Sequence, residues 1–209
     1  MTDERLELRE VAVRTGPVYV DFVNGPTAVR RRAGLSRDPL VRAVGRKTDS
    51  WQVIDATAGL GRDAILLAFS GCQVTMIERS PIVAALLGDG LRRALADPRI
   101  APVIVDRLRL VAGDARSVLS EWAESSPPDA VYIDPMFPHR TKTALSKKEM
   151  RLCRLVSGDD RDAAELFETA CRTARHRVVV KRWLHAPPLG PAPAIQYKGR
   201  SIRYDVYLT

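Results

Sequence analysis

Hydrophobic positions along most of the chain alternate between short apolar runs, typical of strands, and longer segments with apolar residues on one side, typical of helices. From residue 51 to 133 the pattern predicts strands at 51–56, 73–77, 108–112 and 130–133 and helices at 62–70, 81–95 and 115–122. A helix at 162–174 and strands at 177–181, 194–198 and 202–208 are predicted to follow. This order predicts an α/β fold with a mostly parallel seven-stranded sheet, helices on both faces and an antiparallel last strand.

The first 48 residues carry a different pattern. Two short alternating runs, at 6–13 and 18–23, are separated by Gly16-Pro17, which predicts a β-hairpin that ends at Asn24-Gly25-Pro26. A basic segment at 39–45 is predicted to be helical. We therefore expect a small N-terminal extension, residues 1–48, ahead of a main domain at 49–209.

Length and composition narrow the class of protein. A chain of 209 residues with 45% hydrophobic and 28% charged residues is typical of one globular domain with a modest extension. It contains no apolar run long enough for a transmembrane helix, and Met1 to Arg5 lack a secretory pattern, so we expect a cytosolic protein with no membrane partner. Cys72, Cys153 and Cys171 are widely spaced, so neither disulfides nor a metal site is predicted.

The charge distribution favours a nucleic-acid partner. The chain has 33 Lys and Arg against 25 Asp and Glu, a net charge of +8. Basic residues cluster at 30–32, at 140–154 and at 169–204, where no acidic residue occurs. A single basic cluster is as often an ordinary solvated surface as a nucleic-acid contact, but three clusters around one candidate site favour RNA. The residues expected to contact RNA are Arg140, Lys142, Lys147, Lys148, Lys181 and Arg182.

A glycine-containing turn predicts a cofactor site. The apolar strand ending at Asp55 runs into Thr57-Ala58-Gly59-Leu60-Gly61, and a helix then begins at Arg62-Asp63. Small residues let the backbone approach a ligand, and the helix N-terminus supplies unpaired N–H groups. The pattern fits a dinucleotide as well as S-adenosylmethionine, with Glu78 placed to hold a ribose, so by itself it leaves both cofactors open. A tight turn without a ligand is the structural alternative.

The segment Asp134-Pro135-Met136-Phe137-Pro138-His139 favours S-adenosylmethionine over a dinucleotide. It follows the fourth predicted strand and resembles the Asp-Pro-Pro-Tyr motif of methyltransferases that act on exocyclic amino groups. A conjugated amino nitrogen is a weak nucleophile until acceptors bond its hydrogens, which Asp134 is suited to do. Phe137 offers a stacking face and Pro135 fixes the backbone, so these three are the candidate catalytic residues. His139 is expected to contact phosphate or solvent rather than to act as a base.

Several segments together resemble one family. They are Val20 to Val23, Asp55 to Asp63, Glu78 to Leu87, Asp134 to His139, Lys147 to Arg151 and Val178 to Arg182. Over residues about 20 to 207 the chain is similar to the bacterial small-subunit ribosomal RNA guanine-N2 methyltransferases, the RsmJ family. The resemblance implies a class I, Rossmann-like fold and S-adenosylmethionine-dependent methylation of one guanine amino group in 16S ribosomal RNA, free or in the small subunit. Together with the glycine turn, it gives these expected cofactor-binding residues: Asp55, Gly59, Arg62, Asp63, Glu78, Arg79, Gly113, Asp114 and Asp134.

Physical roles can be given to three of these carboxylates. Glu78 is suited to accept hydrogen bonds from both ribose hydroxyls, and Asp114 to accept one from the adenine amino group. Asp63 is suited to bind the methionine ammonium. Two other functions stay open at this point: an NAD-linked oxidoreductase on a Rossmann-like fold, and an RNA-binding module with a vestigial cofactor pocket. Calorimetry with each cofactor distinguishes a methyltransferase from the oxidoreductase, and label transfer to ribosomal RNA distinguishes it from the RNA-binding module.

Overall fold

One mixed sheet forms the centre of the protein. The computed structural model describes residues 5–10, 16–24, 28, 34–135, 151–152, 155–156 and 162–209. The strands of these ranges are β1 (Gln52–Asp55), β2 (Gln73–Glu78), β3 (Leu108–Ala112), β4 (Ala130–Ile133), β5 (Arg177–Trp183), β6 (Ile195–Lys198) and β7 (Ile202–Leu208). Their order is β3-β2-β1-β4-β5-β7-β6, with β1 to β5 parallel and β7 antiparallel to both neighbours. The predicted fold class is confirmed.

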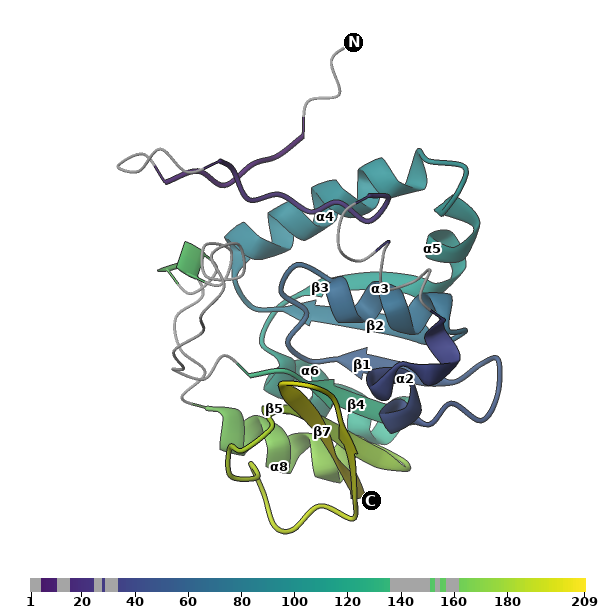
Figure 1. Cartoon of the computed structure of the whole chain (residues 1–209), viewed down its shortest axis with the longest axis vertical. Helices are drawn as coiled ribbons and strands as arrows, with labels where there is room; N and C mark the ends of the chain where they lie inside the picture. The colour runs from purple at the N-terminus through teal and green to yellow at the C-terminus, as the bar shows by residue number, and fades with distance from the viewer. Residues whose placement is uncertain are drawn as a thin grey trace.

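Helices cover both faces of this sheet (Figure 1). They are α2 (Pro39–Val44), α3 (Arg62–Phe69), α4 (Pro81–Leu95), α5 (Ala101–Arg107), α6 (Ala115–Ser125) and α8 (Ala163–Thr173), with a 3-10 turn at Leu35–Arg37. Val53 and Tyr132 pack with α2 to α5, whereas their neighbours Ile54 and Val131 pack with α6 and α8. This alternation along each strand produces two apolar cores, one per face.

Local signals explain the helix bounds. The side chain of Ser80 accepts the N–H of Val83 and Pro81 is the first helical residue, so α4 begins where the sequence predicts. Gly45, with φ +63°, ends α2 in a left-handed cap. The sequence does not predict α5, because Ile100, the residue before it, cannot cap a helix with its side chain, in contrast to Asp38 before α2. In the described part of the chain, no helix is long and apolar enough to cross a membrane.

The N-terminal extension packs onto α4. Leu8 and Val18 form one antiparallel bridge, with N···O distances of 2.8 and 2.9 Å, as the predicted hairpin requires, although residues 11–15 lie outside the described ranges. Val20 and Phe22 are buried in the same core as α3 and α4. The guanidinium of Arg93 donates to the carbonyl of Val20. The extension therefore shares the core of the main domain.

The strand order determines where a ligand can be bound. The chain winds from β1 outwards to β2 and β3 on one side and continues through β4 and β5 on the other. In open sheets of this kind ligands bind beyond the carboxyl ends of the strands where the order reverses. Here that point lies between β1 and β4, beside Asp55, Asp134 and the end of β2.

Candidate active site

The glycine turn connects β1 to α3 at this point. Gly59 and Gly61 have φ values of +53° and +71°, in the left-handed region that favours glycine. A Cβ at Gly61 would lie 2.7 Å from Leu87 Cδ1 and 2.8 Å from Phe22 Cζ. Gly61 is thus required both by backbone conformation and by space, and it places the N-terminus of α3 directly beyond β1.

Glu78, at the end of β2, holds this turn in place. Its Oε2 accepts the N–H of Gly59 at 2.8 Å and its Oε1 accepts the N–H of Ser80 at 2.8 Å. Its backbone carbonyl accepts the N–H of Gly113 at 3.0 Å, which brings the end of β3 alongside. Glu78 is buried, 7% exposed. The predicted cofactor residues Gly59, Glu78 and Gly113 therefore lie together.

A lysine links two further carboxylates at the same edge. Lys181 Nζ, from β5, lies 2.8 Å from Asp63 Oδ2 and 2.7 Å from Asp134 Oδ2. Tyr132 donates its hydroxyl to the same Asp63 oxygen at 2.7 Å. The side chain of Asp134 is 39% exposed, against 10% for that of Asp63. Asp134 is thus the one of the two that a substrate reaches more readily.

Thr57 joins β1 to β4. Its hydroxyl oxygen accepts the backbone N–H of Asp134 at 2.7 Å, and its own N–H donates to Asp55 Oδ1 at 3.2 Å. Asp55 is 1% exposed, and burial, with the charge of Asp63 next, raises its pKa well above the ordinary value. We conclude that Asp55 supports the turn as a buried hydrogen-bond acceptor for Thr57. Pro135, after Asp134, is buried.

Two predicted cofactor residues, Asp114 and Arg79, belong to an ion-pair network between α6 and α8. Arg116 donates to both oxygens of Asp114, at 3.1 and 2.8 Å, and to Glu165 at 2.6 Å. Arg79 donates to Asp162 at 3.0 Å, and both residues are partly exposed. Hydrogen bonds from Arg116 lower the pKa of Asp114. The structure therefore places the Asp114 carboxylate against an arginine, an arrangement not expected from the sequence. Arg62 is exposed at the first position of α3.

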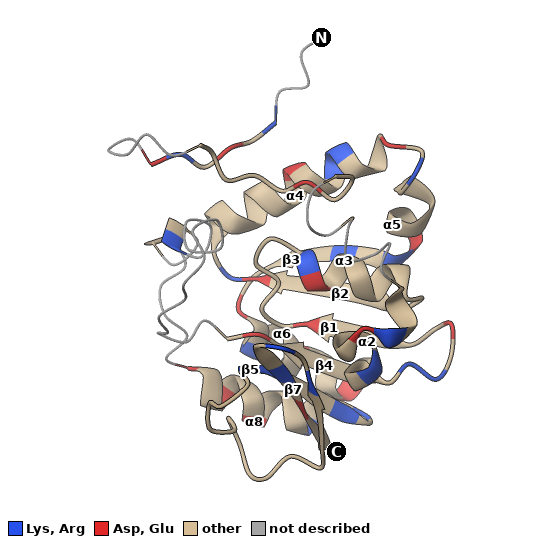
Figure 2. Ribbon diagram, viewed as in Figure 1, with Lys and Arg blue, Asp and Glu red and all other residues tan. Residues whose placement is uncertain are grey.

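The basic stretch at 169–204 differs most from expectation, because Arg182 and Arg203 are buried and Lys181 is half-buried. Figure 2 shows Lys and Arg positions along β5 and β7 of the sheet. Lys181 is paired in the site, as described above, and Arg182 is 6% exposed and donates to the Pro187 carbonyl at 2.6 and 2.9 Å. Arg203 is 4% exposed and pairs with Asp205 at 2.8 Å. This geometry does not favour the expected RNA contacts of Lys181 and Arg182, because acceptors inside the fold bind both cations.

Part of the predicted site lies outside the described residues. This part comprises Met136, Phe137, His139, Arg140, Lys142, Lys147 and Lys148. Among described residues, sequence reasoning missed Thr57 and Arg116 and assigned Lys181 to RNA contact. A signal for Lys181 was present, because a lysine at the carboxyl end of a parallel, apolar strand must lie at the same edge as Asp55 and Asp134.

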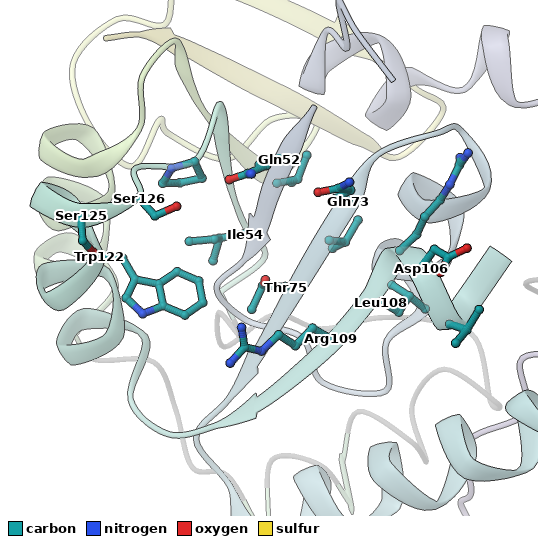
Figure 3. Close-up of a pocket in the computed structure, with 15 residues that line it drawn as sticks. Gln52, Ile54, Gln73, Thr75, Asp106, Leu108, Arg109, Trp122, Ser125 and Ser126 are labelled. Carbon is teal, nitrogen blue, oxygen red and sulfur yellow. The ribbon is translucent and has the colours of Figure 1, made fainter. Parts of the chain in front are cut away.

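A separate cavity of about 510 Å³ lies at the opposite edge of the sheet (Figure 3). Gln52 and Gln73, at the starts of β1 and β2, line it with Arg109 and Trp122, whose guanidinium and ring lie 5.9 Å apart. None of the predicted site residues that the structure describes belongs to the lining. The cavity is therefore distinct from the candidate active site.

The carboxylates at the carboxyl edge of the sheet suit S-adenosylmethionine. Asp63, Glu78 and Asp134 present carboxylates around a glycine turn and a helix N-terminus. A sulfonium and an ammonium are stabilised by such carboxylates, and ribose hydroxyls are donors that a carboxylate with remaining lone pairs accepts. The residues present thus fit this cofactor.

Comparisons with known proteins agree. A family model described as a putative SAM-dependent methyltransferase matches residues 1–209. Proteins named ribosomal RNA small subunit methyltransferase J are similar: that of Thioalkalivibrio sulfidiphilus is 51% identical over 93% of this chain and 77% of its own, and that of Dechloromonas aromatica 50% identical over 98% and 84%. The relative in Pectobacterium atrosepticum is 50% identical over 100% and 85%.

A solved structure is also similar. The crystal structure of a SAM-dependent methyltransferase from Neisseria gonorrhoeae matches with a TM-score of 0.77 and 41% identity, over 97% of this chain and 78% of that one. With the matches in sequence, this favours methyl transfer over the NAD-linked alternative. The chain belongs to the family of ribosomal RNA small subunit methyltransferase J, a family of S-adenosylmethionine-dependent methyltransferases.

Proposed function

We propose that this protein methylates the exocyclic N2 amino group of one guanine in small-subunit, 16S ribosomal RNA. The observation that carries the proposal is the position of Asp134, which follows β4 beside the glycine turn and exposes its carboxylate at the edge where the cofactor residues gather. The names of the relatives support the RNA substrate. The resemblance described from the sequence supports the guanine N2 position.

The cofactor supplies an electrophilic methyl group when bound. Glu78 holds the ribose hydroxyls and Asp63, in the first turn of α3, receives the methionine ammonium. Gly59 and Gly113 allow close approach of the ligand. Asp114 accepts the adenine amino group as a further donor beside Arg116. Asp55 holds the turn through the N–H of Thr57, and the exposed Arg62 and Arg79 lie at the first residue of α3 and directly after Glu78.

Asp134 prepares the substrate for transfer. Its carboxylate accepts a hydrogen bond from the guanine N2 group, which directs the nitrogen lone pair towards the methyl carbon. With the cofactor bound beside Asp134, the amino nitrogen would receive the methyl group that the cofactor supplies, and one proton of the amino group would pass to solvent. Pro135 fixes the backbone after Asp134, and Phe137 stacks on the base.

Contacts to the RNA backbone come from residues after β4. Arg140, Lys142, Lys147 and Lys148 follow the Asp134 motif closely in sequence, and the net charge of +8 favours a polyanion. Lys181 and Arg182 contribute from inside the fold rather than through phosphates. The partner is ribosomal RNA or the small subunit, and a cytosolic location is part of the proposal.

Label transfer from methyl-tritiated cofactor to small-subunit RNA tests the proposal. The RNA is taken from a strain that lacks the endogenous enzyme, and digested nucleosides are separated by chromatography. We expect label in N2-methylguanosine and a fall in kcat of about 100-fold in Asp134→Asn, with RNA affinity nearly unchanged. Asp49→Asn, on the exposed loop before β1, is the matched control. Absence of N2-methylguanosine, or an unchanged rate in Asp134→Asn, contradicts the proposal.

A further inference from the structure

The ammonium of Lys181 connects two carboxylates that approach from different elements. Asp63 comes from α3 and Asp134 follows β4, and Lys181 reaches both from β5, at 2.8 and 2.7 Å. The Lys181 side chain is 22% exposed, so these pairs are shielded from solvent more than ordinary surface ion pairs are. A cation in this position controls where both carboxylates lie.

The groups facing Lys181 keep it charged. Burial by itself lowers the pKa of Lys181, but the charges of Asp134 and Asp63 outweigh burial and raise the pKa well above the ordinary value. An ammonium has no lone pair, so in this state Lys181 cannot accept the proton lost from the substrate. The titratable groups packed around it are Asp63 of α3, Asp55 at the end of β1, Tyr132 of β4, Asp134 after β4 and Tyr204 of β7.

Asp134 is held at two points. Lys181 binds its Oδ2, and Thr57 accepts its backbone N–H at 2.7 Å. Loss of the Lys181 contact would remove the cation that lies between the Asp134 carboxylate and the Asp63 carboxylate. Two neighbouring carboxylates without a counter-charge resist ionisation.

We propose that Lys181 is a positioning residue for methyl transfer, which holds the Asp134 carboxylate ionised and oriented towards the substrate amino group. The inference rests on the proposed function, since it assigns Lys181 a role through Asp134. It differs from a phosphate contact, which would act on RNA affinity. It also differs from a purely structural ion pair, whose loss would alter stability and the titration of Asp134 but leave the methyl-transfer rate of the folded enzyme unchanged.

An NMR titration tests the first half of this inference without any substrate. The protein is labelled with ¹³C at aspartate carboxyls, and Asp134→Asn identifies the resonance. In Lys181→Met we expect the titration midpoint of Asp134 to move up by about one pH unit or more, and in Lys181→Arg to stay nearer the parent. Lys47→Met, on the exposed loop before β1, is the control. An unchanged midpoint in Lys181→Met overturns the inference.

Single-turnover kinetics tests the second half. At neutral pH Lys181→Met should transfer methyl about 50-fold more slowly, because the Asp134 carboxylate is no longer oriented, with the half-saturating RNA concentration within about three-fold of the parent value. The rate should fall further as the pH drops towards the raised midpoint of Asp134. If Lys181 acts through Asp134, the double variant Lys181→Met with Asp134→Asn is no slower than Asp134→Asn alone. Additive losses, or a Lys181→Met enzyme with the parent rate, overturn the inference.

The two proposals fail in different ways. If the parent enzyme transfers no label to ribosomal RNA, the proposed function fails, and the NMR titration still decides whether Lys181 controls Asp134. Thermal melting checks that each variant folds. If Lys181→Met does not fold, two other variants replace it: Lys181→Arg, and the double variant, in which residue 134 carries no charge. The inference is overturned if the Asp134 midpoint in Lys181→Arg stays at the parent value while the rate falls as far as in Asp134→Asn.

Discussion

Glu78 Oε2 accepts the backbone N–H of Gly59 at 2.8 Å, so one carboxylate at the end of β2 holds the turn that follows β1. Its other oxygen accepts the N–H of Ser80, the cap of α4. Each carboxylate oxygen has lone-pair capacity for more than one donor. Glu78 can thus shape the turn and receive ribose hydroxyls together, which links the fold directly to cofactor binding.

Replacement of Glu78 should weaken cofactor binding. Glu78→Gln and Glu78→Ala remove charge-assisted hydrogen bonds, and we expect a loss of about 1 to 3 kcal/mol in the binding free energy of S-adenosylmethionine, measured by titration calorimetry. Glu124→Ala, at an exposed position of α6, is the matched control. An unchanged dissociation constant in both Glu78 variants would remove this residue from the cofactor site.

Two glycines of α4 should respond oppositely to alanine. A Cβ at Gly88 meets Leu110 Cδ2 at 3.8 Å, an ordinary contact, whereas a Cβ at Gly90 overlaps the Val20 side chain. We expect Gly88→Ala to raise the free energy of unfolding by about 0.5 to 1 kcal/mol and Gly90→Ala to lower it by about 1 to 3 kcal/mol. Urea denaturation measures both. Val20→Ala should relieve part of the Gly90→Ala defect, and equal effects at the two glycines would argue against the packing of the N-terminal extension.

The buried pair of Arg203 and Asp205 should contribute strongly to stability. Arg203 donates to both Asp205 oxygens and to the carbonyls of Trp183, Leu184 and Ala186. Arg203→Met leaves the Asp205 charge buried with one remaining side-chain donor, Gln196. We expect a loss of about 3 to 5 kcal/mol in the free energy of unfolding.

Arg200→Met provides the control for this change, because Arg200 is exposed three residues earlier on the β6–β7 turn. Its effect should stay within about 0.5 kcal/mol. If both variants unfold at the same urea concentration as the parent, Arg203 does not hold the loop after β5 in the way the structure shows.

Salt dependence of RNA binding should separate exposed cations from buried ones. If Lys147 and Lys148 contact phosphates, each change to Ala should reduce the slope of log affinity against log salt by about 0.7 to 0.9. Arg182→Met should leave that slope near the parent value, because Arg182 is buried against the Pro187 carbonyl. A parent slope in the Lys147→Ala, Lys148→Ala double variant would show that these lysines form an ordinary solvated surface.

The order of the elements, and the edge of the sheet at which the chemistry lies, follow from local patterns in the amino-acid sequence. Predicted ranges such as 81–95 and 108–112 equal the observed α4 and β3, because caps and hydrophobic periods are local signals. Asp55 and Glu78 end parallel strands and Asp134 directly follows another, so they had to meet at one edge. Chain direction and strand polarity suffice for that inference.

The partners of the charged side chains, in contrast, depend on contacts between segments that are distant in the sequence. Lys181, Arg182 and Arg203 belong to a stretch that reads as a basic surface, yet in the fold they bind two aspartates, a carbonyl and a buried carboxylate. Asp114 is likewise bound by Arg116. The physical reason is that long basic side chains can point to solvent or back across the sheet. Which direction is lower in free energy depends on acceptors brought near by distant segments, and no local pattern records those acceptors.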